Sequence, residues 1–228
     1  MRKNVFISKL RMNIPGKALV ASVALAGFSV LSAVAVPVTV QDVGMGAQEE
    51  VQMTSSTLGT HWVYAGTINL LVNGAATQGF CIDPFHWSIT GPQSYNSEPL
   101  ANAPKSPING MGAATALKIE QLYSQYYSPS IGNENAAGLQ IAIWELVGGS
   151  NFHLDSSPDY GASSMLTWVN THPLASAADL IAVTGPGQDY LIPQQHVPDA
   201  GETALMLGCG LVGLFIVRSK FLRVRAAK

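Results

Sequence analysis

Positive charge is almost absent from the middle of this sequence. Between Lys17 and Arg218 the basic residues are Lys105 and Lys118 alone, whereas residues 36–199 contain 13 aspartates and glutamates, which gives this segment a formal charge of −11. A protein that binds the phosphates of a nucleic acid needs clustered lysine and arginine to displace the counterions. We therefore exclude nucleic acid as a partner.

Metal-binding patterns are missing as well. Calcium loops follow an Asp-x-Asp-x-Asp pattern that closes with a glutamate, and the acidic residues of this sequence form no such loop. The five histidines show none of the ligand spacings that are typical of zinc sites. The sequence predicts neither a metal site nor a cofactor.

The basic residues gather at the two ends of the chain, with five in the first 17 residues and five in the last 11. Residues 1–35 are typical of a secretory signal peptide: a basic start, an apolar stretch over 18–34, and Ala33-Val34-Ala35, the small-x-small pattern that signal peptidase cleaves. An uncleaved membrane anchor is the alternative, because the apolar stretch is nearly long enough to span a bilayer. The cleavage pattern and Pro37 favour removal by signal peptidase.

Residues 197–228 combine a short motif, an apolar run and a basic end. The motif is Val197-Pro198-Asp199-Ala200-Gly201, and the uncharged run Ala204–Val217 follows it. This run has 14 residues, whereas a stable transmembrane helix needs about 20. It therefore predicts a transient hold on the membrane, with the basic end on the cytoplasmic side.

This three-part order resembles the PEP-CTERM class of sorting signals, which exosortases recognise. The motif is most similar to the VPDSG-CTERM variant, although Ala200 stands where that variant has serine. The resemblance implies that Val197, Pro198, Asp199 and Gly201 mark the place where an exosortase cleaves the chain, which then reaches the cell surface or the extracellular matrix. A simple tail anchor is the alternative.

The chain has only two cysteines, and Cys209 lies inside the apolar run that this processing would remove. Proteins outside the cell usually pair their cysteines, because a lone thiol oxidises or cross-links. Cys81 would then be unpaired. It has three open explanations: a buried thiol that packs as a small apolar group, a disulfide between two chains, or a sulfur held in an internal bond.

The segment between the two ends has the length of one domain. Residues 36–57 are polar and weakly patterned, so we expect a linker or irregular lead-in there, followed by an extracellular domain over residues 58–195. A hairpin turn is expected at Asn73-Gly74 and a long loop over Asp83–Pro107. The expected strands are His61–Val72, Thr77–Ile82 and Gln188–Ile192, and the expected helices are Gly112–Tyr127, Ala136–Val147, Ala162–Thr171 and a short one at Ala175–Ile181.

These elements predict an α+β fold, with a small antiparallel sheet packed against a few helices. An N-terminal signal helix and a C-terminal apolar helix would flank it.

Two short segments resemble the thioester domains of bacterial surface adhesins. They are Phe80-Cys81-Ile82-Asp83 and the helical Leu139-Gln140-Ile141-Ala142-Ile143-Trp144. In that family a cysteine sulfur displaces ammonia from a glutamine side chain, and the resulting thioester then acylates an amine on the target. The resemblance implies a covalent bond between Cys81 and Gln140, although Leu139 replaces the usual threonine.

Two neighbouring residues have supporting roles under the same resemblance. Trp144 lies one helical turn after Gln140, on the same face, where it would shield the bond from water. Asp83 lies two residues after Cys81, on the same side of a strand, where it would orient a neighbouring group. A thioester of this kind reacts once, so we expect no enzyme with turnover; the expected partner is an amine-bearing surface, polysaccharide or protein target.

Two other functions stay open. The pattern of Leu139–Trp144 is also typical of a plain amphipathic core helix. In that case the protein would be a non-reactive structural protein of the extracellular matrix with the same fold. A Cys-dependent hydrolase is the third hypothesis, with Cys81 as nucleophile and His86 as its base.

Overall fold

The computed structural model describes residues 35–104 and 110–194 of the chain. The predicted signal peptide, except Ala35, and the predicted sorting tail from residue 197 onward lie outside these residues, and so do the two flanking helices that the sequence predicts. The elements in chain order are β1 (Val36–Ser55), β2 (Gly59–Val72), β3 (Ala75–Cys81), β4 (Gln93–Pro99), the 3₁₀ helix η1 (Leu100–Asn102), α1 (Gly112–Tyr126), α2 (Asn133–Gly148), the 3₁₀ helix η2 (Gly149–Asn151), β5 (Phe152–Leu154), α3 (Ala162–Thr171), β6 (Leu180–Thr184) and β7 (Tyr190–Pro193). The predicted α+β class is confirmed.

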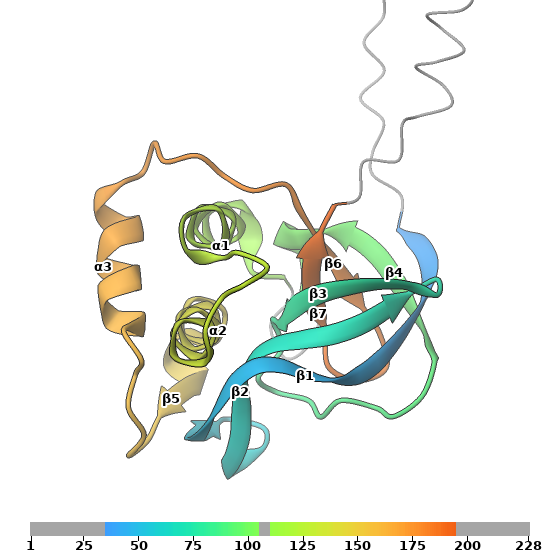
Figure 1. Ribbon diagram of the computed structural model, residues 1–228, viewed down its shortest axis with the longest axis horizontal. Helices are drawn as coiled ribbons and strands as arrows, with labels where there is room; N and C mark the ends of the chain where they lie inside the picture. The colour runs from blue at the N-terminus through green and yellow to red at the C-terminus, as the bar shows by residue number, and fades with distance from the viewer. Residues whose placement is uncertain (1–34, 105–109, 195–228) are drawn as a thin grey trace, which may run out of the picture. The chain divides into compact units, whose positions relative to one another are not determined.

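Six strands form a closed antiparallel ring. The pairings run from β1 to β2, β3, β7, β6 and β4, and β4 pairs again with β1. Strand β5 adds a short pairing at the far end of β1. Figure 1 shows the ring on one side of the molecule and the three helices on the other. Closure removes the unpaired edges that an open sheet would expose.

The ring closes because β1 is long and bent. Its first residues pair with β4, and it pairs with β2 from Val40 to Ser55, with register irregularities between Asp42 and Gly44 and between Met45 and Gln48. Bulges of this kind bend a strand and increase its twist. They also break the two-residue period, so the alternation of buried residues is regular only from Val51 to Ser55. For this reason the sequence indicated an irregular lead-in over residues 36–57. Residues 36–55 instead form β1, the longest strand among the described residues.

Gly66 fits the second bulge and provides a test of it. Its φ is +154°, and an added Cβ would collide with the carbonyl oxygen of Ala47. We expect Gly66→Ala to lower the free energy of unfolding by roughly 1–3 kcal/mol, as overpacking does elsewhere. Gly132→Ala is the matched control, because its φ is −77° and open space surrounds it. Denaturant unfolding of both variants checks this, and equal losses would contradict it.

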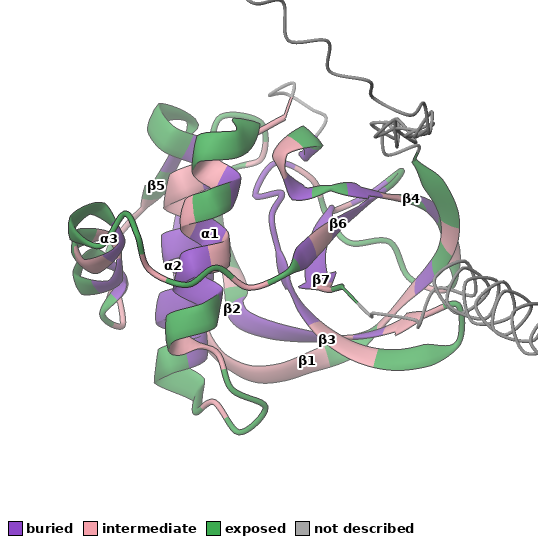
Figure 2. Ribbon diagram, turned by 90° about the horizontal axis from the view of Figure 1, so that it is seen from above, coloured by how far each residue is buried: buried purple, intermediate pink, exposed green. Residues whose placement is uncertain are grey.

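Helix α2 is the centre of the helical layer. Every residue from Ala136 to Trp144 is buried, which is expected of a helix that is surrounded by protein. It contacts α1 and α3 on one side and β1, β2 and β3 on the other. Figure 2 shows it as a mainly buried helix between the ring and α3. It begins at Asn133, three residues before the predicted start.

Two expected elements differ from the structure. The segment predicted as a short helix over Ala175–Ile181 is irregular until β6 begins at Leu180. The buried Gln121 side chain fixes it, donating hydrogen bonds to the carbonyl oxygens of Pro173 and Ala175. The predicted loop Asp83–Pro107 contains β4 and η1, because ring pairing stabilises a strand whose own composition is polar. Within residues 35–104 and 110–194, no helix has both the length and the apolar character to cross a membrane.

Candidate functional site

Cys81 and Gln140 meet in the interior, although 59 positions separate them. The backbone N–H of Cys81 donates to Gln140 Oε1 at 2.9 Å, and Gln140 Nε2 donates to the carbonyl oxygen of Cys81 at 2.7 Å. Both residues are buried. A buried carboxamide needs such partners, and here the pair of hydrogen bonds places it against the cysteine that the sequence had singled out.

The fold brings the pair together at the point where the ring meets the helical layer. Cys81 is the last residue of β3 and pairs with Tyr190 of β7. Its neighbour Phe80 makes edge-to-face contacts with Tyr123 and Tyr127. These contacts attach the end of β3 to the region of α1. Gln140 lies midway along the buried helix α2, so rigid elements hold both side chains.

Asp83 touches the sulfur through its backbone. Strand β3 ends at Cys81, so Asp83 lies after the strand, and the alternation of strand side chains does not place it beside the sulfur. Its N–H donates to Cys81 Sγ at 3.3 Å, and its Oδ1 accepts from the N–H of Phe85 at 3.0 Å. Its Oδ2 lies 2.7 Å from Nδ1 of His86. Burial raises the pKa of the Asp83 carboxyl, and the hydrogen bond from His86 opposes that rise.

The Cys81 thiol is held in its neutral form. Burial raises its pKa far above the ordinary value, and the negative charge of Asp83 raises it further. The indole of Trp144 and the backbone N–H of Asp83 act in the opposite direction. A thiolate is the nucleophilic form of cysteine. The site therefore disfavours the thiolate form of Cys81 in the folded protein.

Trp144 covers the pair from the next turn of α2. Its side chain is buried, and it contacts the ring of Phe152 with a centroid distance of 5.8 Å. Among the described residues its Nε1 has no hydrogen-bond acceptor in bonding geometry. The indole still acts on the neighbouring sulfur, because it lowers the pKa of the Cys81 thiol.

A cavity of about 310 Å³ reaches Cys81, one member of the buried pair. Its walls include the buried Cys81 and Trp144, and also Trp62, Tyr64 and Trp87, whose side chains are more than half exposed. The ring of Trp87 also contacts His61, with a centroid distance of 5.2 Å. The sequence did not predict this aromatic rim. The strand pattern around Trp62 and Tyr64 was visible, but nothing in it placed Trp87 beside them.

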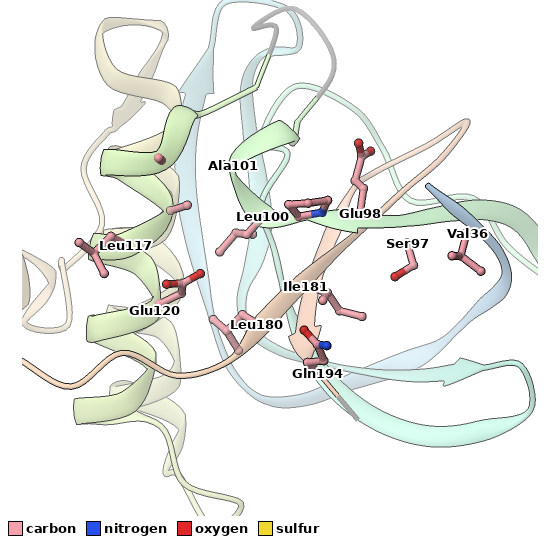
Figure 3. A pocket seen from close by; sticks show the side chains of 13 residues that line it. Val36, Ser97, Glu98, Leu100, Ala101, Leu117, Glu120, Leu180, Ile181 and Gln194 are labelled. Carbon is pink, nitrogen blue, oxygen red and sulfur yellow. The ribbon is translucent and has the colours of Figure 1, made fainter. Parts of the chain in front are cut away.

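A larger cavity of about 470 Å³ lies elsewhere, between α1, β4 and β6 (Figure 3). Its polar side chains include Glu98, which accepts a hydrogen bond from Thr184, and Glu120, whose pKa is raised by burial and by Asp179. Cys81 does not line it, whereas Cys81 lines the smaller cavity. The smaller cavity is therefore the candidate site.

The comparisons with known proteins bear on the C-terminal end first. Residues 196–221 match the VPDSG-CTERM motif. This match confirms the resemblance that Val197, Pro198, Asp199 and Gly201 carry, despite Ala200, and these residues lie outside the part of the chain that the structure describes. The chain is also similar to the N-terminal thioester domain of a surface protein from Clostridium perfringens, at 13% identity and a TM-score of 0.40, over 64% of this chain and 99% of that one. No curated protein matches.

Proposed function

We propose that this is an exported surface or matrix protein that attaches covalently to amines through a thioester between Cys81 and Gln140. The main support for the proposal is the pair of hydrogen bonds that holds the Gln140 carboxamide against the backbone of Cys81. The VPDSG-CTERM match supports export and processing by an exosortase. The cell surface and the extracellular matrix are the two proposed destinations.

The geometry suits bond formation. When Cys81 Sγ attacks the side-chain carbonyl carbon of Gln140, negative charge develops on Oε1, which already accepts the N–H of Cys81. A donor fixed at this oxygen stabilises the charge as it forms. The C–N bond then breaks, and the amide nitrogen leaves as ammonia with the proton that the thiol gave up. Since the thiol is neutral at rest, this proton must be removed during the attack.

The product is a buried acyl group that reacts once. A target amine forms an amide with Gln140, and Cys81 regains its thiol. No step regenerates the thioester, so we propose a single-use attachment and not an enzyme with turnover. A protein that keeps the same fold without the bond would serve as a passive matrix component.

Intact mass of the protein, purified without reductant, tests the proposal. We expect a mass that is short by one ammonia, and peptide mapping should join Cys81 to Gln140. Exposure to a small primary amine should then add the whole mass of that amine at Gln140. A mass equal to that of the processed sequence, with a thiol at Cys81 that titrates on unfolding, would refute the covalent function and leave the passive one.

A further inference from the structure

The cavity beside Cys81 is lined by a histidine that has no role in the proposed formation of the thioester. The His86 side chain is 38% exposed and lines the cavity together with Cys81. An ionised carboxylate only accepts hydrogen bonds, so Asp83 Oδ2 places the imidazole hydrogen on Nδ1 and leaves the lone pair on Nε2. Asp83 also donates its backbone N–H to the Cys81 sulfur. One residue therefore orients both the sulfur and a base.

The reaction of a thioester with an amine needs such a base. A primary alkylamine has a pKa near that of lysine, about 10.4, so at neutral pH it is mostly an ammonium ion without a lone pair. It must lose a proton before it can attack. Water can take this proton, but a base fixed at the entrance of the cavity does so more efficiently.

The walls of the cavity can bind the alkylammonium ion before it loses that proton. The exposed rings of Trp62, Tyr64 and Trp87 line its outer part, and aromatic faces attract an ammonium group that lies within about 6 Å. The carboxylate of Asp42 lines the same cavity. The segment 36–199 has a formal charge of −11, which attracts cations from solution.

We propose that a primary alkylammonium group enters this cavity and that His86 takes its proton before the amine attacks the thioester. The inference rests on the proposed function. His86 Nε2 accepts one proton from the ammonium, and the free amine attacks the acyl carbon of Gln140. The C–N bond forms as the C–S bond breaks, and a second proton from the nitrogen ends on the Cys81 sulfur. The imidazolium then returns its proton to water.

The test compares the rate of adduct formation with butylamine in the wild type, His86→Ala and His153→Ala, each followed by intact mass. His153 is the matched control, because it is exposed on β5, lies 3.9 Å from Asp155 and is not part of the cavity. We expect His86→Ala to react about 100-fold more slowly, in line with the usual contribution of a positioned base. Imidazole added to the solution should restore much of this rate and leave the other two proteins unchanged.

The outcomes separate the two proposals. A wild type without the loss of ammonia refutes the thioester itself. If His86→Ala carries the thioester but reacts at the wild-type rate, the role of His86 is overturned and the thioester stands. A slow variant that imidazole does not rescue would make His86 structural, and a variant without any thioester would place His86 in bond formation; either result overturns its assignment to the amine.

Discussion

Replacing Cys81 by alanine should lower the free energy of unfolding by about 4 kcal/mol. The proposed thioester closes a loop of 59 positions between the end of β3 and the middle of α2. A covalent link restricts the unfolded chain, and the chain-entropy relation for a loop of this length gives about 4 kcal/mol. Denaturant unfolding of the wild type and of Cys81→Ala, both freshly purified, measures the difference.

Wild-type protein that has reacted with butylamine is the matched control for this prediction. It keeps the Cys81 side chain but has lost the link, so its stability should fall close to that of Cys81→Ala. Since the alanine variant also loses a small buried side chain, it should remain slightly the less stable of the two. Unchanged stability after the amine reaction would show that the link does not stabilise the folded protein in this way.

Replacing Trp144 by alanine should have two effects. The side chain is buried against Phe152, and truncation of a buried tryptophan costs about 3–5 kcal/mol. The void would also join the cavity beside Cys81 and admit water to the acyl carbon. We therefore expect the thioester to hydrolyse during purification, so that Gln140 is recovered as glutamate and Cys81 as a free thiol, both detected by peptide mass.

Trp168→Ala is the control for this second prediction. Trp168 is half-buried on α3, where it contacts Tyr126 and His172, and it is not part of the cavity. Its loss should destabilise the domain without exposing the acyl group. If Trp144→Ala keeps its thioester as long as Trp168→Ala does, the shielding role of Trp144 is wrong.

Local patterns predicted much of this fold and part of the site. The strands around the Asn73-Gly74 turn and the three long helices follow from periodicity and turn residues, and the structure places them within a few residues of their expected ends. The two short segments around Cys81 and Gln140 also indicated a pair that the structure then brings into contact. Such features depend on neighbours in the chain, which a sequence displays directly.

What the sequence did not predict depends on distant partners. Strand β4 has a polar composition and exists because β1 and β6 pair with it. The bulges in β1 concealed its alternation, and with it the closure of the ring. The contact between Asp83 and His86 forms in the loop that was expected after β3, but nothing in the sequence showed how this loop folds. The rim of the cavity likewise joins Trp62 of β2 to Trp87 of a loop.

The closed ring also determines how the molecule would bear mechanical tension. Under the proposed function, a captured target pulls on Gln140 in α2, while the sorted end of the chain continues from β7. Strand β7 is paired on one side with β3 and on the other with β6, and β3 continues into β2, which contacts α2. Load between the two attachment points would then pass through the hydrogen bonds of these strand pairs. Because β7 is held on both sides, we expect the domain to resist extension until its pairings with both β3 and β6 break.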